Sequence, residues 1–358
     1  MAEPAGWRWE FASEAAADEL GSAPQNLLEA AEPVKANPVR KVFRTGEFYL
    51  KLDLRPGNRL SREWRSAALL AARHIPMVEH LALGRSSCGE LLITRALPDA
   101  IQAGTYFCRN CLRDGAPAEE FAESLAEFAR QIIGSGLFHP DFHCGNVLYL
   151  PERNKFALVD VYGVRKSTFF DRFRRYRMER ILLELREALD RATLLRLLAV
   201  EGVAAPENFY RKALKREARH LFHEWPKRRR QILAGYPKFT RAEGHLLRVV
   251  DPAGEEIEDV AGEPFPGDAD TLEQLLLAHF FLQLARIPHR RVLSLDRERR
   301  LLFRQELPPA PAPAVPVPAG EWPERLAAYG LQFRPEEWGF DRFGRPELRN
   351  FQQVTSLV

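Results

Sequence analysis

The residues best suited to chemistry in this chain lie in one short run and in one aspartate that follows it. The run spans His139 to Asn146 and reads H-x-D-x-x-x-x-N, and Asp160 follows fourteen positions later in the pattern D-x-x-G. In kinase-type phosphotransfer, an aspartate in the place of Asp141 accepts the proton of the attacking hydroxyl. Residues in the places of Asn146 and Asp160 hold Mg²⁺ against the ATP phosphates. The spacing therefore predicts a phosphotransfer centre that uses ATP and Mg²⁺.

Two neighbours of these residues are expected to shape the loop. We interpret His139 as a structural histidine that packs the catalytic loop and bonds to its backbone. Gly163 ends the D-x-x-G pattern and allows the chain to turn away from the metal site. Taken singly, Asp141 could cap a turn and Asn146 could start one, so the prediction rests on the joint spacing. We assign no acid or base role to His143.

A phosphotransfer centre of this kind also needs a lysine on a strand and a glutamate on the next helix. Lys51 lies in the alternating segment 48–54, and Glu63 lies near the start of a helical pattern over 60–73. We expect Lys51 to bind the ATP phosphates and Glu63 to orient it. The plain alternatives are a solvent-facing strand lysine and a glutamate favoured by the helix dipole. Glu79 is a weaker competitor because it follows Pro76.

The remaining nucleotide contacts are expected at the strand edges. No G-x-G-x-x-G precedes Lys51, so we take Lys35, between the first strands, as the candidate for a phosphate contact, with Arg40 as the alternative. Thr94 lies in the predicted strand 91–96 and Leu97 opens a hinge, and we expect both to contact the nucleotide. Pro140 stands where protein kinases carry the arginine that pairs with a phosphorylated activation loop, which argues against that form of control.

Composition and patterning indicate a soluble α+β chain of several segments. Its 358 residues are 46% hydrophobic and 28% charged, with a formal net charge of +3. No apolar stretch approaches the roughly 18 residues that span a bilayer, and the N-terminus lacks the apolar core of a signal peptide, so we expect a cytoplasmic protein. We predict a bilobal protein-kinase-like fold with a small antiparallel-sheet N-lobe and a mainly helical C-lobe. The predicted segments are an extension (1–30) without a clear strand pattern, the N-lobe (31–97), the C-lobe (98–306), a Pro/Ala-rich linker (307–320) and an aromatic tail (321–358). The aromatic residues of the tail indicate that it packs against another surface, which the sequence does not identify.

Basic and cysteine-containing segments lie outside the predicted centre. Arginines alternate with aromatic residues after Lys166, and a second basic cluster spans residues 227–230. A solvated helix face is the default interpretation; the alternative is contact with an anionic substrate or with the inner face of the inner membrane. Cys108 and Cys111 form a C-x-x-C without a second ligand pair, so reduced thiols are favoured over a zinc site. The arginines assigned to the membrane contact are Arg172, Arg174, Arg175 and Arg177.

The sequence resembles the bacterial lipopolysaccharide core (Kdo/heptose) kinases over roughly residues 32–162. The resemblance is carried by the strand pair 39–43 and 48–51, the Glu63-Trp64 helix, the hinge strand 91–96 and the catalytic run with Asp160. It implies a protein-kinase-like fold, ATP, Mg²⁺ and a sugar hydroxyl acceptor on the anionic glycolipid lipid A–core. The resemblance also implies that the enzyme acts at the inner face of the inner membrane. By the same resemblance, Lys51 binds the ATP phosphates, Glu63 supports Lys51, Asp141 is the base, and Asn146 and Asp160 hold the metal ion.

Three other functions stay open. The first is a small-molecule kinase of the aminoglycoside or choline type, which uses the same H-x-D-x-x-x-x-N run on a small alcohol. The second is a protein kinase, although no extended activation segment follows Gly163. The third is a non-catalytic pseudokinase that binds a partner through its aromatic tail. No recognition module for nucleic acid is present, and the total charge is nearly balanced, so we expect no nucleic-acid partner.

Overall fold

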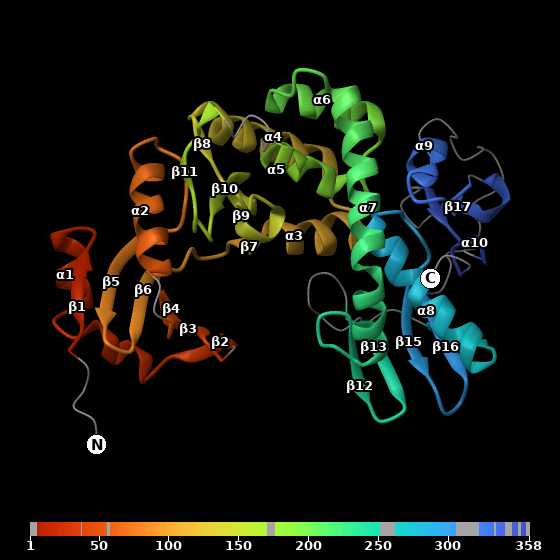
Figure 1. The fold of residues 1–358 in the computed structure, drawn as a ribbon, viewed down its shortest axis with the longest axis horizontal. Coiled ribbons are helices and arrows are strands. Elements are labelled where there is room, and N and C mark those ends of the chain that lie inside the picture. The colour runs from red at the N-terminus through yellow and green to blue at the C-terminus, as the bar shows by residue number, and fades with distance from the viewer. Residues whose placement is uncertain are drawn as a thin grey trace. The chain divides into compact units, whose positions relative to one another are not determined.

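A computed structural model of the chain describes residues 6–36, 38–55, 58–169, 176–250, 262–305, 322–332, 334–340, 346–349 and 352–355. The chain forms two compact units, which are described separately here (Figure 1). Unit 1 consists of Met1–Ala103 and Ser124–Ile181, and unit 2 consists of Gly104–Glu123 and Leu182–Val358. These divisions differ from the segment boundaries expected from the sequence.

A six-stranded antiparallel sheet dominates the first part of unit 1. Its strand order is β1-β5-β6-β4-β3-β2. Thr45 pairs with Phe48 across the turn between β3 and β4, so the hairpin predicted from the alternating pattern is confirmed. Gly46 holds a φ of 51° in that turn, a conformation that glycine adopts without steric cost. The strands are β1 (Arg8–Phe11), β2 (Glu32–Ala36), β3 (Arg40–Thr45), β4 (Phe48–Asp53), β5 (His80–Ser86) and β6 (Gly89–Arg95).

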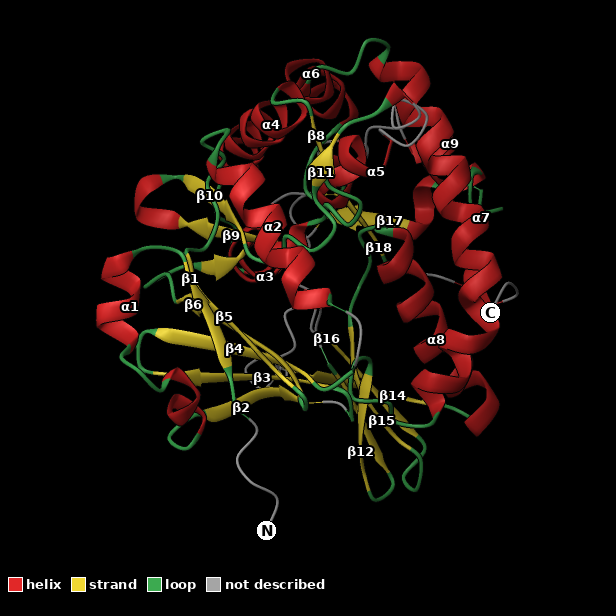
Figure 2. Ribbon diagram, turned by 60° about the vertical axis from the view of Figure 1, so that its left-hand side comes forward, coloured by secondary structure: helices red, strands yellow, loops and turns green. Residues whose placement is uncertain are grey.

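Helix α2 (Arg59–Ala71) packs on this sheet against β4, β5 and β6 (Figure 2). One face of the helix is apolar, and Leu60, Ala67 and Leu70 on that face are buried. Leu60 packs with Leu83 and Leu92 of the sheet. The helical pattern predicted over 60–73 is therefore confirmed to within two residues at each end.

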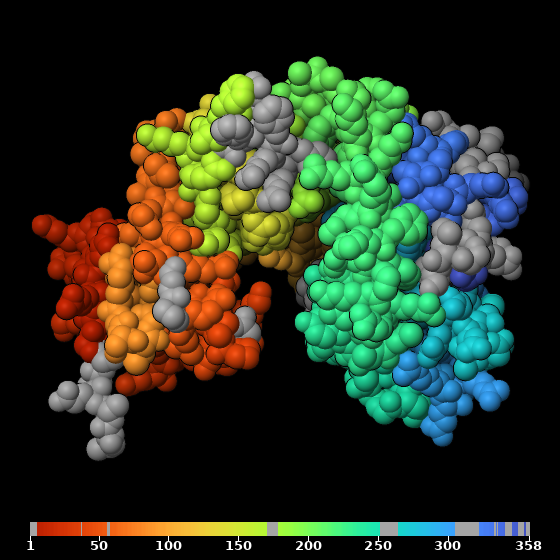
Figure 3. All heavy atoms as spheres, viewed as in Figure 1, coloured from red at the N-terminus to blue at the C-terminus, as the bar shows by residue number. Residues whose placement is uncertain are grey.

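The N-terminal segment contains a strand, which the sequence analysis did not expect. Strand β1 pairs with β5, and α1 (Glu14–Leu20) follows it beside the same strand. Gly84 of β5 makes room for this pairing, because a Cβ atom there would lie 2.7 Å from the Trp9 ring. In the space-filling view, the red N-terminal residues lie directly against the orange surface of the sheet (Figure 3). The expectation of an extension without a clear strand pattern over 1–30 was therefore wrong, because Trp7, Trp9 and Phe11 pack, partly buried, against the core of the sheet and β1 adds an edge strand to it.

The rest of unit 1 carries the loop predicted to be catalytic. Strands β9 and β10 form the expected short hairpin, and β7 pairs with the outer side of β9. The loop from His139 to Asn146 runs between β8 and β9. The elements are β7 (Ile101–Gln102), β8 (Leu137–Phe138), a 3-10 turn (Cys144–Asn146), β9 (Val147–Leu150), a 3-10 turn (Pro151–Arg153), β10 (Lys155–Leu158), β11 (Arg165–Lys166) and α5 (Tyr176–Glu179). A 3-10 helix (Pro24–Leu28) precedes β2, a second (Arg180–Leu185) follows α5, and α4 (Ala118–Gly134) crosses the boundary between the units.

Unit 2 combines helices with a second antiparallel sheet, which the sequence patterns did not indicate. Its five strands have the order β12-β13-β15-β16-β14, and the α7 and α8 helices pack against each other (Figure 1). The helices are α3 (Ala103–Tyr106), which starts one residue before the unit boundary, a π-helix (Phe107–Arg113), α6 (Arg191–Glu201), α7 (Pro206–Leu233) and α8 (Ala269–Ala285). The strands are β12 (Thr240–Glu243), β13 (Leu246–Val249), β14 (Gly262–Pro266), β15 (Val292–Asp296) and β16 (Leu301–Gln305). Cys108 and Cys111 are buried in the π-helix.

The aromatic tail packs into the core of unit 2. Trp322 and Trp338 are buried with ring centroids 4.6 Å apart, and both belong to the cluster built around α8. The side chain of Arg325 is buried and donates to the backbone oxygen of Arg186 at 2.8 Å. The predicted docking partner of the tail is therefore its own chain. Its elements are α9 (Trp322–Ala327), a 3-10 turn (Pro335–Glu337), β17 (Trp338–Phe340), β18 (Pro346–Leu348) and α10 (Gln352–Thr355). The predicted linker over 307–320 lies outside the described residues.

Two histidines in the core of unit 2 are held neutral. His279 of α8 and His289 are buried, and the His289 Nε2 atom lies 2.8 Å from His279 Nδ1. His289 Nδ1 lies 2.7 Å from the Ile287 carbonyl and donates to it, so in the neutral ring His289 Nε2 is the unprotonated nitrogen. Burial lowers the pKa of His289 to about 4 and lowers the pKa of His279 well below its ordinary value. Neither side chain is charged at neutral pH.

This pair predicts a loss of stability in mild acid. The unfolded chain takes up protons at the ordinary histidine pKa of about 6.5, whereas the folded pair resists them until the pH is far lower. The free energy of unfolding should therefore fall as the pH drops from about 6.5 towards 4, by up to about 1.4 kcal/mol per pH unit for each histidine. Denaturant titrations at several pH values measure this slope. His279→Gln, which cannot take up the proton, should reduce the slope, and His223→Gln on the exposed face of α7 should not. Equal slopes in all three proteins would contradict the assignment.

Candidate active site

The structure brings Lys51 and Glu63 together inside unit 1. Lys51 lies in the middle of β4, between Val42 of β3 and Leu92 of β6. Its Nζ atom donates to Glu63 Oε1 at 2.5 Å, and the two side chains are 15% and 3% exposed. The pair is thus shielded from solvent, where a salt bridge is screened less than at the surface.

The electrostatic environment keeps the Glu63 carboxylate charged. Burial by itself would raise the pKa of Glu63, but the positive charge and hydrogen bond of Lys51, together with the His80 side chain, outweigh it and lower the pKa to about 2. His80 Nε2 lies 3.7 Å from Glu63 Oε1, and His80 Nδ1 is 3.0 Å from the Val78 carbonyl. Sequence analysis missed His80, because its position at the start of a buried strand does not distinguish it from an ordinary core residue.

A carboxylate from the sheet fixes the start of α2. Asn58 precedes the helix in a left-handed conformation and gives no side-chain cap, so the first amides need another acceptor. Glu90 of β6 supplies it: Glu90 Oε2 accepts from the Leu60 amide at 2.8 Å and the Ser61 amide at 3.3 Å, and Oε1 accepts from the Ser61 hydroxyl. A negative charge at a helix N-terminus is also favoured by the helix dipole. The only signal for Glu90 in the sequence was a lone charge at the edge of an apolar strand.

Two more contacts hold α2 along its length. The Ser66 hydroxyl donates to the Val164 carbonyl at 2.8 Å, which ties the helix to the segment after Asp160. On the other side, the Trp64 indole donates to Glu10 of β1 at 2.7 Å. Helix α2 is therefore fastened to both the sheet and the segment that carries Asp160, and the position of Glu63 follows from these bonds.

Lys51 also reaches the segment that carries the predicted metal ligands. Its Nζ atom donates to the Val159 carbonyl at 3.2 Å, directly before Asp160. The Val159 amide in turn donates to the Asn146 carbonyl at 3.1 Å. The ammonium group of β4 and the backbones of Asn146 and Asp160 thus lie within one connected set of hydrogen bonds.

His139 joins the two aspartates through their backbones. The Asp141 amide donates to His139 Nδ1 at 3.2 Å, so Nδ1 must be the unprotonated nitrogen, and Nε2 donates to the Asp160 carbonyl at 3.1 Å. Burial lowers the pKa of His139 to about 4, although the charges of Asp160 and Asp141 act in the opposite direction. The imidazole is therefore neutral and serves as a bridge.

Asn146 holds Asp141 in place. The Asn146 side-chain amide donates to the Asp141 backbone oxygen at 3.0 Å and to Oδ2 at 3.2 Å, and His143 Nε2 lies 3.7 Å from Oδ1. The Asp141 side chain is 69% exposed, so a substrate group can approach it. Because the amide nitrogen of Asn146 is committed to Asp141, the amide oxygen is the atom of Asn146 suited to bind a cation.

The turn after Asp160 depends on a glycine. Asp160 Oδ1 accepts from the Tyr162 amide at 3.3 Å, which orients one side of the carboxylate. Gly163 has a φ of 81°, and a Cβ atom there would lie 3.1 Å from Pro140 Cγ. Any other residue would combine backbone strain with a tight contact to the catalytic loop. The predicted use of Gly163 to turn the chain away therefore has a physical basis in this structure.

The other residues predicted to contact the nucleotide or a membrane have no described hydrogen bond or ion pair with the residues predicted for catalysis and metal binding. Lys35 is exposed on the edge strand β2, with β3 between it and β4. Thr94 is buried in β6 opposite Tyr49, and Leu97 is half-buried just after that strand. Their roles in nucleotide binding stay predictions. Arg172, Arg174 and Arg175 lie outside the described residues, and of Arg177 only its place in α5 is described.

The donor set matches a hard cation that takes oxygen ligands. Within the described ranges, no three His, Cys, Asp or Glu side chains cluster in a way that would form a complete metal site. Asp160 and Asn146 instead offer one carboxylate and one amide oxygen, a small set of the kind that binds Mg²⁺ together with substrate phosphates. The described residues therefore suit a metal ion that arrives with a phosphate ligand.

Comparisons with known proteins give only distant similarity. No protein-family model matches the chain, and neither does any curated protein. Among solved structures, the chain is similar to the kinase PK-1 of the Cydia pomonella granulovirus, with 13% identity and a TM-score of 0.35. That match covers 48% of this chain and 76% of the viral chain. The comparisons do not support the lipopolysaccharide core kinase family in particular. The predicted α+β class, with an antiparallel sheet in the N-terminal part of the chain, is confirmed by the element order and the sheet topology.

The buried pair predicts a cost for removing its lysine. Lys51→Met leaves Glu63 buried with much less compensation, so the free energy of unfolding at neutral pH should fall by about 3 kcal/mol. The pKa of Glu63 should rise in the variant, because burial raises this pKa and only His80 then remains as a main group that lowers it. The wild-type stabilisation from Glu63 is present above its ordinary pKa of 4.5 and is lost as the pH falls towards about 2. The difference between variant and wild type should therefore shrink below about pH 4.5.

Denaturant titrations of both proteins at neutral and acidic pH measure this effect. Lys155→Met is the matched control, because Lys155 is an exposed lysine at the start of β10. The double variant Lys51→Met/Glu63→Gln removes the charge that Lys51 compensates and should recover part of the lost stability. A Lys51→Met protein as stable as Lys155→Met would contradict the assignment.

Proposed function

We propose that the protein is a kinase that transfers the γ-phosphoryl group of ATP to an alcohol. The observation that carries the proposal is the position of the Lys51 ammonium, which binds Glu63 on one side and the carbonyl next to Asp160 on the other. That lysine belongs to the sheet, and the aspartates belong to the loops that follow α4. Phosphotransfer by positioning requires such a cation beside the metal ligands.

The residues of the chain take distinct roles in this proposal. Lys51 binds the ATP phosphates, and Glu63 orients its ammonium group through the hydrogen bond to Oε1. Asn146 and Asp160 hold the Mg²⁺ ion, which neutralises charge on the phosphates when it is bound. Asp141 accepts the proton of the acceptor hydroxyl, and Asn146 fixes its carboxylate by the bond to Oδ2. The acceleration comes mainly from positioning and from electrostatic stabilisation.

The fastening of α2 favours an enzyme that needs no activation-loop phosphorylation. Glu90 fixes the helix start and Ser66 fixes its middle, so Glu63 meets Lys51 in the unmodified chain. Pro140 replaces the arginine that would read a phosphorylated loop. These observations support a site in which Lys51 and Glu63 are paired without prior phosphorylation of the protein.

For the acceptor we propose a sugar hydroxyl of lipopolysaccharide core, a heptose or Kdo. The support is the sequence resemblance over residues 32–162, together with the basic residues after Lys166, which suit an anionic glycolipid. The proposed place of action is the cytoplasm, with peripheral contact at the inner face of the inner membrane. In the described part of the chain, no helix has the length and apolar character needed to cross a bilayer.

The decisive experiment supplies labelled ATP and Mg²⁺ with two sets of acceptors. One set contains truncated core glycolipids, and the other contains small alcohols such as aminoglycosides and choline. We expect transfer to a core glycolipid, and we expect Asp141→Asn to slow it about 10²–10⁴-fold because the proton acceptor is lost. Asp18→Asn, an exposed aspartate of α1, is the matched control and should keep full activity.

The outcomes separate the candidate functions. Transfer only to small alcohols would replace the glycolipid acceptor by the small-molecule alternative and leave the kinase assignment intact. Full ATP turnover by Asp141→Asn would rule out the assigned base. No transfer to any acceptor and no binding of ATP would favour a non-catalytic interaction protein.

A second prediction concerns the metal. ATP should raise the melting temperature of the protein more with Mg²⁺ than without it, because a ligand that binds only the folded state stabilises it according to its affinity. Asp160→Asn keeps an acceptor for the Tyr162 amide but loses the negative charge. The variant should therefore retain its fold and lose most of the extra rise in melting temperature that Mg²⁺ adds to the effect of ATP. Thermal denaturation with ATP, with and without Mg²⁺, measures the difference. An unchanged Mg²⁺ effect in Asp160→Asn would remove Asp160 from the metal site.

A further inference from the structure

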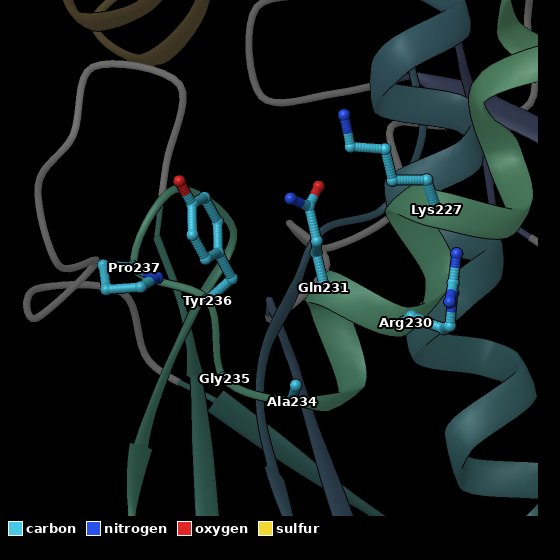
Figure 4. Close-up of a pocket in the computed structure, with 7 residues that line it drawn as sticks. All are labelled: Lys227, Arg230, Gln231, Ala234, Gly235, Tyr236 and Pro237. Carbon is cyan, nitrogen blue, oxygen red and sulfur yellow. The ribbon is translucent and has the colours of Figure 1, made fainter.

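A surface pocket of unit 2 lies where α7 ends and the chain turns towards β12 (Figure 4). Its volume is about 420 Å³, and its lining includes Lys227, Arg230, Gln231 and Tyr236. Gln231 Oε1 is shielded from solvent and therefore out of reach of a ligand, and the other three side chains are exposed. A more selective arrangement of polar groups lies in unit 1, where His143 faces Asp141.

His143 lies in the loop that carries Asp141, between two buried residues. Phe142 and Cys144 are buried, whereas the His143 side chain is 32% exposed and the Asp141 side chain is 69% exposed. The backbone at His143 is extended, with a φ of −153° and a ψ of 163°. Side chains alternate between two sides along an extended chain, so the burial of both neighbours turns the imidazole towards the side on which Asp141 is accessible.

One ring nitrogen of His143 is occupied by the backbone. The Gly145 amide donates to His143 Nδ1 at 3.0 Å, and the Asn146 amide donates to the His143 carbonyl at 2.9 Å. A backbone amide can only donate, so Nδ1 is the unprotonated nitrogen, and the neutral ring carries its hydrogen on Nε2. The imidazole therefore presents a hydrogen-bond donor on the side away from the turn.

Gly145 provides the space that this ring occupies. A Cβ atom at Gly145 would lie 2.7 Å from His143 Cε1 and 2.8 Å from Nδ1, closer than such atoms can approach. The Gly145 carbonyl also accepts from the side-chain amide of Gln102, which ties the turn to β7. The position of the imidazole is thus fixed by the fold of the loop and does not require a bound substrate.

The Nε2 atom of His143 faces one oxygen of the Asp141 carboxylate. Nε2 lies 3.7 Å from Asp141 Oδ1, while the Asn146 side-chain amide donates to Oδ2 at 3.2 Å. A distance of 3.7 Å is too long for a direct hydrogen bond. Hydrogen bonds of catalytic groups are often long in the absence of substrate and shorten when the substrate binds. A rotation of the exposed carboxylate brings Oδ1 closer to this donor.

Capping the turn does not by itself require a histidine. Asparagine, aspartate and serine accept a hydrogen bond from a nearby backbone amide with a shorter side chain, and they are the residues usually found in such caps. Histidine differs from them because its second ring nitrogen lies on the far side of the ring from the cap. At His143 that second nitrogen is the one that faces Asp141.

We propose that His143 is a positioning residue for Asp141. During phosphotransfer, His143 Nε2 donates to Asp141 Oδ1 while Asn146 donates to Oδ2, so that a donor on each oxygen fixes the plane of the carboxylate. The remaining lone pairs face the acceptor hydroxyl, whose proton passes to Asp141, and His143 keeps its own proton throughout. The effect on rate rests on the proposed function, whereas the interaction of the two side chains can be tested without it.

NMR of ¹⁵N-labelled histidine side chains tests this interaction in the absence of substrate. His143→Asn identifies the signals of His143 by their loss. At pH 8, where an ordinary histidine is neutral, we expect the His143 hydrogen on Nε2. Asp141→Asn should shift the Nε2 signal, because it removes the negative charge that this N–H faces, and Asp18→Asn on α1 should not. A hydrogen on Nδ1, or an Nε2 signal unchanged by Asp141→Asn, would overturn the proposal.

Measurements of kcat and of KM for ATP separate positioning from capping. His143→Asn keeps an acceptor for the Gly145 amide but lacks Nε2. We expect it to lower kcat about 10–100-fold, the range for loss of a hydrogen bond to a charged group, with KM for ATP nearly unchanged. His143→Gln places an amide nitrogen close to the position of Nε2 and should recover most of this loss. His220→Asn, at an exposed position of α7, is the matched control and should keep full activity.

The outcomes distinguish this proposal from its alternatives and from the proposed function. Wild-type kcat in His143→Asn would overturn the proposal, and so would equal losses in the Asn and Gln variants. A higher KM for ATP at unchanged kcat would overturn it as well, because the ring would then act on the nucleotide and not on Asp141. If the wild-type protein transfers phosphate to no acceptor, the proposed function fails, and the NMR result alone decides whether His143 donates towards Asp141.

Discussion

The buried ion pair between Lys51 and Glu63 is the interaction on which the rest of unit 1 depends. A carboxylate that is 3% exposed would ordinarily favour its neutral form, yet the ammonium at 2.5 Å lowers its pKa to about 2. Such a pair is costly to bury and is maintained only when the surrounding structure places both partners accurately. The strand register of β4 places the lysine, and the contacts of α2 place the glutamate.

The contacts of α2 also explain how a site with parts from distant segments is assembled. Glu90 caps the helix from the sheet side, while Ser66 bonds to the segment that follows Asp160. Lys51 donates to the carbonyl before Asp160, and His139 links that aspartate to Asp141 through two backbone bonds. Apart from the bond between His139 and Asp141, which lies within one loop, each of these bonds connects elements that are far apart in the sequence. Lys51, predicted to bind phosphate, and Asp141, predicted to accept the proton, are thus connected by hydrogen bonds to backbone groups and by one buried ion pair. Buried interactions of this kind are screened little by salt.

Sequence patterns predicted the parts of this arrangement that depend on local order. The alternation in 48–54 indicated the strand of Lys51, and the helical pattern that follows indicated the helix of Glu63, because both signals come from neighbouring residues. Glu90, His80 and Ser66 were missed, since their importance arises only when a strand meets a helix in three dimensions. The edge strand β1 and the sheet of unit 2 were missed for the same reason: strand pairing over long separations leaves little trace in composition. The α7 helix continues past Pro226, although a proline in a helix interior normally ends or kinks the helix.

A crystal structure of the protein with a non-hydrolysable ATP analogue and Mg²⁺ would test the central claim most directly. The account predicts Lys51 Nζ in contact with the analogue's phosphates while still bonded to Glu63. It also predicts the metal ion on Asp160 and the amide oxygen of Asn146, with Asp141 facing the terminal phosphate. A nucleotide bound elsewhere, or a bound nucleotide whose phosphates and metal contact neither Lys51 nor Asp160, would contradict it.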